Sequence, residues 1–130
     1  MDGTNNGMDQ YKGLRCYTDG SKTCGGTGAG FCVAEHNSIL KSRAFGLTPS
    51  ATVFQAEAKA IELAAKELST LLEQKTIVPS MENKVVLLCD SKSVIDALGR
   101  IDTKSHVIRE TKAALSALSK HAEILWMQTT

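Results

Sequence analysis

Three carboxylates lie where the sequence pattern changes from one element to the next. Asp19 lies in the segment Tyr-Thr-Asp-Gly-Ser, Glu57 ends Phe-Gln-Ala-Glu, and Asp90 lies in Leu-Leu-Cys-Asp-Ser. Two unit charges about 4 Å apart repel by roughly 4 kcal/mol at an effective dielectric of 20, so a cluster of these acids would require cations. Mg²⁺ and Mn²⁺ prefer oxygen ligands and also take up phosphate oxygens. The residue types therefore indicate a divalent-metal site suited to phosphodiester chemistry.

The elements that position Asp19 are predicted to be strands. Alternating residues predict a first strand over residues 14–19, followed by a Gly-rich stretch and two further strands over residues 29–34 and 39–45. Their short connections favour an antiparallel meander. We expect Gly20 to let the chain leave the first strand directly after Asp19.

Glu57 falls within a predicted helix over residues 52–72. The apolar positions recur at helical spacing on one face: Phe54, Ala58, Ile61, Ala65, Leu68 and Leu72. Glu57 shares a row with Ile61, Ala64 and Leu68, which predicts that its carboxylate points toward the sheet rather than toward water. A charged residue on an apolar face needs a partner.

Asp90 follows a short apolar run, residues 85–89, that predicts a central strand buried on both faces. Ligand sites in α/β sheets favour the carboxyl ends of such strands, so Asp19 and Asp90 are expected to be neighbours. Asp90 or Ser91 is predicted to cap a short helix that Gly99 ends in the left-handed conformation. The pattern then predicts a helix over residues 104–120 and a strand over residues 123–127, giving the order βββαβααβ.

Length and composition favour one domain. The chain has 130 residues, is 42% hydrophobic and carries a net charge of +1, which neither suggests nor excludes a nucleic-acid partner. Residues 1–12 are polar and rich in Gly and Asn, and we expect a disordered leader or linker there, with the domain over residues 13–130. No apolar run approaches the roughly 20 residues needed to cross a bilayer, so a membrane partner is not expected.

Four cysteines lie in or beside apolar segments, without a C-x-x-C pair or a signal peptide. We interpret them as free thiols of a protein in a reducing compartment, the cytoplasm or nucleus. A zinc site using Cys24 or Cys32 with His36 matches no recognised ligand spacing. The glycines of residues 25–30 are not followed by the Lys-Ser/Thr of a phosphate loop, which favours a hairpin and strand. His106 and His121 lie at the ends of a predicted helix and favour surface or capping roles.

In this order, the motifs Tyr-Thr-Asp-Gly-Ser, Gly-Thr-Gly-Ala-Gly-Phe, Val-Phe-Gln-Ala-Glu and Leu-Leu-Cys-Asp-Ser-Lys resemble the type I ribonuclease H domain, and especially that of non-LTR retrotransposons. The resemblance runs from about Leu14 to Met127. It implies an α/β fold with a mixed five-stranded sheet and helices on both faces. It also implies an endonuclease that hydrolyses the RNA strand of RNA–DNA hybrids by two-metal-ion catalysis.

The resemblance implies that Asp19, Glu57 and Asp90 are both catalytic residues and ligands of Mg²⁺, with Mn²⁺ as an alternative. Asp19 would bridge two ions, and Glu57 and Asp90 would hold the ion on the leaving-group side. Family members read the minor groove of the hybrid, where the 2′-hydroxyl distinguishes RNA from DNA. Substrate contacts are expected from Gly20, Ser21, Gln55, Ser91 and Lys92.

The sequence also departs from the family pattern. The final helix, which carries a fourth acidic ligand, is absent after Trp126, so we expect a C-terminally truncated domain that could pair with itself or with a protein partner through the uncovered surface. Lys92 stands where the family often has Gln, and the basic helix that strengthens hybrid binding in some members is absent, so modest affinity is expected. Two hypotheses follow: a metal-dependent nuclease, and a catalytically inactive domain that binds nucleic acid or protein.

Overall fold

The computed structural model describes residues 13–23, 26–48, 50–74, 84–100 and 105–128, with the backbone alone at Ser21, Lys22 and Thr23. The expected leader, residues 1–12, lies outside the described residues. The described elements follow the predicted order βββαβααβ: β1 (Arg15–Thr23), β2 (Gly26–Glu35), β3 (Ser38–Leu47), α1 (Val53–Glu73), β4 (Lys84–Cys89), α2 (Lys92–Leu98), α3 (His106–Leu118) and β5 (Glu123–Gln128).

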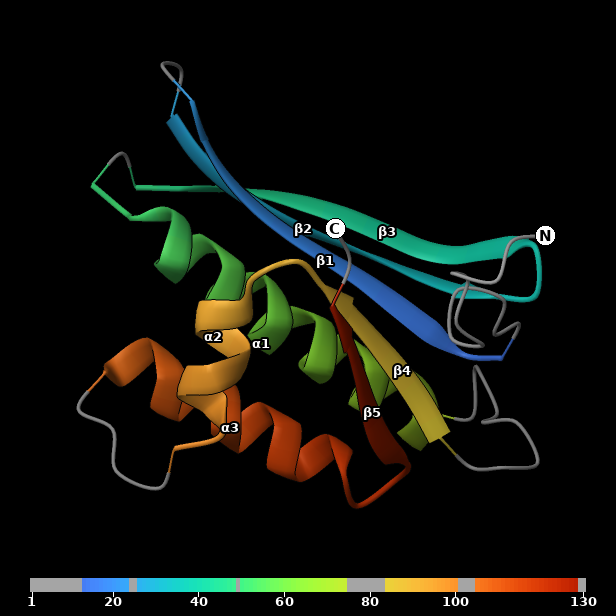
Figure 1. The fold of residues 1–130 in the computed structure, drawn as a ribbon. Coiled ribbons are helices and arrows are strands. Elements are labelled where there is room, and N and C mark those ends of the chain that lie inside the picture. The colour runs from blue at the N-terminus through green and yellow to red at the C-terminus, as the bar shows by residue number, and fades with distance from the viewer. Residues whose placement is uncertain (1–12, 24–25, 49, 75–83, 101–104, 129–130) are drawn as a thin grey trace, which may run out of the picture.

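The strands form one mixed sheet in the order β3-β2-β1-β4-β5 (Figure 1). The pairs β1–β2 and β2–β3 are antiparallel, whereas β4 pairs parallel to both β1 and β5. The predicted meander and the predicted central strand are both confirmed, and residues 85–89 of β4 are all buried. The sheet thus places the carboxyl end of β4 beside the first half of β1, although the two strands are far apart in the sequence.

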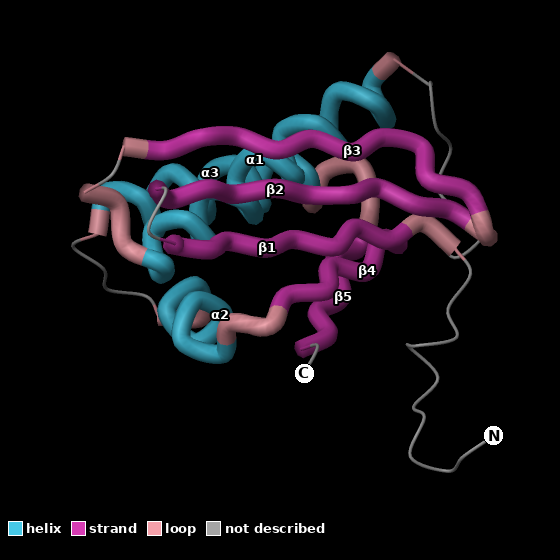
Figure 2. Tube along the Cα trace, turned by 90° about the horizontal axis from the view of Figure 1, so that it is seen from above, coloured by secondary structure: helices cyan, strands magenta, loops and turns pink. Residues whose placement is uncertain are grey.

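Helices α1 and α3 cover one face of the sheet, and α2 lies beyond the end of β4 (Figure 2). Helices on both faces were expected from the resemblance; within the described residues, the core lies between the sheet and the α1–α3 layer. This core contains buried side chains from the sheet and its flanking residue, from α1 and from α3, including Leu14, Val33, Leu68, Leu87 and Leu118. The apolar stripes read from the sequence therefore face the sheet as predicted.

Side-chain caps fix where the helices begin. Thr52 and Gln55 form a capping box on α1: the Thr52 hydroxyl accepts from the Gln55 amide at 3.0 Å, and Gln55 Oε1 accepts from the Thr52 amide at 2.9 Å. Ser91, one of the two predicted caps, accepts from the Val94 amide at the start of α2. Ser105 plays the same part for α3.

Two local predictions were wrong. First, β1 does not end at Asp19 but continues through Gly20 to Thr23, because its ladder with β2 is unbroken from Arg15 to Thr23. Second, Gly99 has φ −80° and ψ −10°, so α2 ends in right-handed geometry. The Gly99 amide bonds the carbonyls of Ile95 and Asp96, and this closes the helix without a left-handed residue.

The cysteine prediction agrees with the described residues. Cys16 and Cys89 are buried free thiols, and Cys32 is a half-buried one. Cys24 lies outside the described residues. Within the described helices, none is long and apolar enough to cross a membrane.

Candidate metal-binding site

The sheet places Asp19 and Asp90 at the same level. In the parallel pair β1–β4, Arg15 lies opposite Val86, and Tyr17 lies opposite Leu88. Two residues further along each strand, this register reaches Asp19 and Asp90. Asp19, within β1, and Asp90, directly after the end of β4, are therefore neighbours, as expected from the sequence, although Asp19 does not end its strand.

Gly20 brings α1 against β1 at the position of Glu57. A Cβ atom at Gly20 would lie 2.5 Å from the Glu57 amide nitrogen and 2.6 Å from the carbonyl carbon of Ala56. No side chain fits at such distances from backbone atoms. The glycine after Asp19 thus permits the helix to approach the strand, and the approach sets Glu57 next to Asp90 and close enough to Asp19 for its charge to act on Glu57.

The surroundings of Glu57 disfavour its charged form. Burial raises the pKa of the Glu57 carboxyl first, and the negative charge of Asp90 raises it further. A hydrogen bond from Ser91 acts in the opposite direction, whereas the charge of Asp19 adds to the increase. Glu57 Oε2 is buried and has no hydrogen-bond partner among the described residues. The carboxylate that was predicted to point toward the sheet therefore lies beside two other acids, whose charges raise its pKa.

A third possible ligand, which the sequence analysis did not single out, lies beside Glu57 and Asp90. The Cys89 sulfur and one carboxylate oxygen from each acid all lie within 4.8 Å of one another. Burial raises the pKa of the Cys89 thiol, while hydrogen bonds with the Ser91 amide and the Thr18 side chain lower it. Strand periodicity could have identified this residue, because Cys89 follows Val85 and Leu87 on the face that meets the helix.

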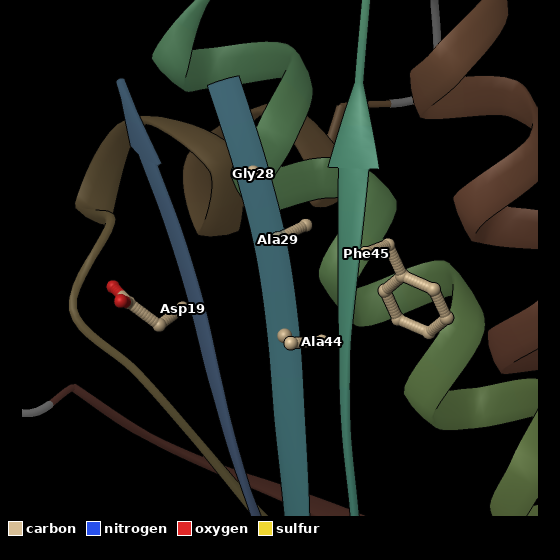
Figure 3. Close-up of a pocket in the computed structure, with 6 residues that line it drawn as sticks. Asp19, Gly28, Ala29, Ala44 and Phe45 are labelled. Carbon is tan, nitrogen blue, oxygen red and sulfur yellow. The ribbon is translucent and has the colours of Figure 1, made fainter. Parts of the chain in front are cut away.

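Asp19 stands apart from this group and is exposed. Figure 3 shows its carboxylate leaving β1 on the side away from β2. A depression of about 250 Å³ adjoins it, lined by Asp19, Gly28, Ala29, Gly30, Ala44 and Phe45. On β2, Gly30 lies opposite Asp19, and on β3, Ala44 lies opposite Gly30. In this row, the sheet beside Asp19 therefore carries almost no side-chain atoms.

The predicted substrate-contact residues differ in how exposed they are and in the contacts that they already make. Gln55 is exposed at the start of α1, with its Oε1 atom used in the capping box. Lys92 is exposed at the start of α2 and lies 3.7 Å from Asp96. Ser91 is only 8% exposed and is used as the α2 cap. Gly20 is packed against α1, and Ser21 is described by its backbone in β1.

The residues present fit a hard divalent cation. Mg²⁺ binds through one or two carboxylates together with water and phosphate oxygens, and it does not need a complete protein cage. Glu57 and Asp90 supply two adjacent carboxylates, and the buried Oε2 atom of Glu57 has no hydrogen-bond partner in the part of the chain that the structure describes. A bound cation would offset both the burial and the repulsion that raise the Glu57 pKa.

The alternatives raised by the sequence do not form a comparable site. Within the described residues, Glu57, Cys89 and Asp90 make up the only group of three or more possible ligands whose atoms lie within 4.8 Å of one another, so Cys32 and His36 are not part of one. His106 is the first residue of α3, and His121 follows its end, as predicted. Gly26 to Gly30 belong to strand β2, which confirms the hairpin-and-strand prediction against a phosphate loop.

Comparison with known proteins relates the chain to ribonuclease H structures. No protein-family model and no curated protein matches the sequence. The crystal structure of RNase H1 from the halophilic archaeon Halobacterium salinarum matches with a TM-score of 0.65 and 21% identity, over 89% of this chain and 84% of that chain. LC11-RNase H1, solved in complex with an RNA/DNA hybrid, matches with a TM-score of 0.67 and 18% identity over the same shares.

A viral domain gives the same result. The solution structure of the PFV RNase H domain matches with a TM-score of 0.60 and 24% identity, over 96% of this chain and 82% of that chain. At these identities the likeness concerns the fold. The chain thus has the ribonuclease H-like fold, with the five-stranded sheet and three helices described above. The special closeness to retrotransposon domains stays a prediction.

Proposed function

We propose that this protein is a metal-dependent ribonuclease H that cleaves the RNA strand of RNA–DNA hybrids as an endonuclease. The observation that carries the proposal is the state of Glu57: a carboxylate with a buried, unpartnered oxygen, held beside Asp90 with a raised pKa. The fold supports it, since a structure of the same fold was solved with an RNA/DNA hybrid. The retrotransposon origin suggested by the motifs belongs to the same proposal.

Asp19, Glu57 and Asp90 are the proposed metal ligands. Mg²⁺, or Mn²⁺ in its place, would activate water and stabilise the departing 3′ oxygen when bound. Glu57 and Asp90 hold one side of the site from α1 and from the end of β4. Asp19, on β1 at the level of Asp90, would hold the cation from the other side with its exposed carboxylate.

Substrate recognition is proposed for the residues around these acids. The Gln55 amide group can donate to a 2′-hydroxyl because its Oε1 atom is already used in the capping box. Lys92 can reach a phosphate by exchanging its exposed ion pair with Asp96. The backbone of Gly20 and Ser21, which carries little side chain, can approach the RNA strand closely. Ser91 is buried, and we expect it to position Glu57 rather than to touch the substrate.

The proposal is tested by cleavage of a labelled RNA–DNA hybrid in Mg²⁺ and then in Mn²⁺, with Asp19→Asn as the paired variant. We expect RNA-strand cleavage by the wild type and its loss in Asp19→Asn, because the exposed Asp19 carboxylate can be changed with little effect on packing. Cleavage that persists in Asp19→Asn would argue for a contaminating nuclease.

A second function is favoured by one observation. Within the described residues, Asp19 lies outside the group of ligand atoms formed by Glu57, Cys89 and Asp90. A site with two adjacent carboxylates could bind a cation and a nucleic acid without turnover. Hybrid binding by the wild type, measured by fluorescence anisotropy, without cleavage in either metal would favour this inactive binding domain and contradict the nuclease.

A further inference from the structure

The Cys89 thiol distinguishes this site from a purely carboxylate one. Cys89 ends β4 and is 1% exposed, and its sulfur accepts a hydrogen bond from the Ser91 amide at 3.4 Å. It packs in a small cluster with Ala58, Ile61 and Val94. The sulfur is therefore held by the strand and by its neighbours on α1 and α2, on the side from which Glu57 approaches.

The ligand atoms are almost close enough for one ion. Zn–S distances of about 2.3 Å and Zn–O distances of about 2.0–2.2 Å place tetrahedral ligand atoms roughly 3.4–3.6 Å apart. The Cys89 sulfur and the oxygens of Glu57 and Asp90 lie within 4.8 Å of one another, so small side-chain rotations would bring them to that spacing. Asp90 is exposed, so its carboxylate can rotate, and among the described residues Glu57 Oε2 has no hydrogen bond to give up when it binds an ion.

The chemistry of the three donors points to a borderline metal. Mg²⁺ takes oxygen ligands and gains little from sulfur, whereas thiolate ligands select Zn²⁺ among the common divalent ions. Two carboxylates and one thiolate leave the fourth position of a tetrahedral zinc ion to water. Binding would release the thiol proton to solvent, and it would place the lone Glu57 oxygen beside a cation.

We propose that Glu57, Asp90 and Cys89 form a zinc-binding site, and that Cys89 sets the preference of this centre for Zn²⁺ over Mg²⁺. The binding part stands on the ligand geometry alone. Its consequence for catalysis rests on the proposed function: Zn²⁺ held by Cys89 would occupy the position of Mg²⁺ and inhibit hybrid cleavage.

Cobalt titration tests the thiolate ligand directly. Co²⁺ substitutes for Zn²⁺ and gives a near-ultraviolet charge-transfer band only when a thiolate is bound. We expect this band in the wild type and its loss in Cys89→Ala, which keeps a small apolar side chain at this buried position. Cys32→Ser is the matched control: Cys32 is half-buried on β2 and outside the ligand group, so the band should remain.

Calorimetric titration with Zn²⁺ and with Mg²⁺ measures the preference. Cys89→Ala should lower the Zn²⁺ affinity at least about tenfold, the smaller end of the loss seen when groups that support a metal are removed. The Mg²⁺ affinity should change less than the Zn²⁺ affinity. Glu57→Gln, which keeps the thiol, should also weaken Zn²⁺ binding, and this variant answers the question if Cys89→Ala does not fold.

The outcomes separate the inference from the proposed function. No charge-transfer band in the wild type, or a band that persists in Cys89→Ala, would overturn the zinc site even if hybrids are cleaved in Mg²⁺. A Cys89-dependent band without any hybrid cleavage would support the zinc site and contradict the nuclease. With both present, added Zn²⁺ should inhibit the wild type at lower concentrations than Cys89→Ala.

Discussion

Two acids on the same helix, Glu57 and Glu62, have opposite electrostatic environments. Glu62 is 2% exposed, yet its two oxygens lie 3.2 Å from Lys59 Nζ and 2.7 Å from Lys66 Nζ. Burial by itself raises the pKa of Glu62, but the hydrogen bonds from Lys66 and Lys59 outweigh it and lower the pKa. Glu57 is less buried, but it faces Asp90 and Asp19, has an unpartnered oxygen, and its pKa is raised.

The difference shows how the negative charge of each acid is compensated. Around Glu62 the sequence supplies two lysines at the i−3 and i+4 positions, which is how a helix stabilises an acid within its own surface. Around Glu57 it supplies two more carboxylates and a thiol, all from other elements. The Glu62 region is complete within the protein, whereas the Glu57 region gains a favourable charge balance only when a cation binds.

Neutralising each acid in turn should give the largest contrast. We expect Glu57→Gln to reduce hybrid cleavage at least about 100-fold, because changes to groups that merely support a metal ligand already cost about 10–100-fold. Glu62→Gln should leave the rate within about twofold. The stabilities should move the other way: Glu57→Gln should gain about 0.5–2 kcal/mol, as is common when functional groups are removed, and Glu62→Gln should lose stability. Cleavage rates and urea unfolding of both variants check this.

Removing the lysines should turn Glu62 into a second uncompensated acid. We expect Lys59→Met with Lys66→Met to cost roughly 3 kcal/mol, the low end for unpairing a buried charge, since both lysine side chains are partly exposed. Adding Glu62→Gln should restore most of that loss, which urea unfolding measures. An equally unstable triple variant would mean that the lysines act through packing rather than charge.

Widening the approach of α1 to β1 should damage only the Glu57 region. Gly20→Ala places a methyl group 2.5 Å from a backbone nitrogen, and we expect a cost of about 1–3 kcal/mol, typical of overpacking, together with weaker cleavage. Gly46→Ala is the control: nothing lies within 4 Å of its added Cβ, so the change should stay within about 0.5 kcal/mol. Thermal unfolding of both variants compares them, and equal losses would contradict the close-approach argument.

The smallest expected effect is that the two acids contribute to the stability of the fold in different pH ranges. The folded-state pKa of Glu57 is raised above its ordinary 4.5, so its contribution to stability is present below pH 4.5 and is lost as the pH rises through the folded-state pKa. The pKa of Glu62 is lowered, so its contribution is present above pH 4.5 and is lost as the pH falls through the folded-state pKa.

Unfolding free energies of the wild type, Glu57→Gln and Glu62→Gln over an acid-to-neutral pH series test this. The difference between the wild type and Glu57→Gln should change above pH 4.5, and the difference for Glu62→Gln below it. Two differences that change in the same pH window would show that the acids do not have opposite environments.

The sequence by itself determined the element order and the apolar faces, and it named the three acids that we propose as ligands. Periodicity carries this information because a strand alternates every two residues and a helix returns every 3.6, so the apolar faces of α1 and β4 could be read directly. It also placed Glu57 on the sheet-facing side of α1. These features depend only on local spacing along the chain.

Only the tertiary structure decided how the acids meet and what lies between them. The extension of β1 beyond Asp19 depends on pairing with β2, and the role of Gly20 depends on the approach of α1, neither of which is local. The separation of Asp19 from the Glu57–Cys89–Asp90 group, and the pairing of Glu62 but not Glu57, likewise follow from distances across elements. Electrostatic interactions act through space, so the sequence names the charges and the fold sets their energies.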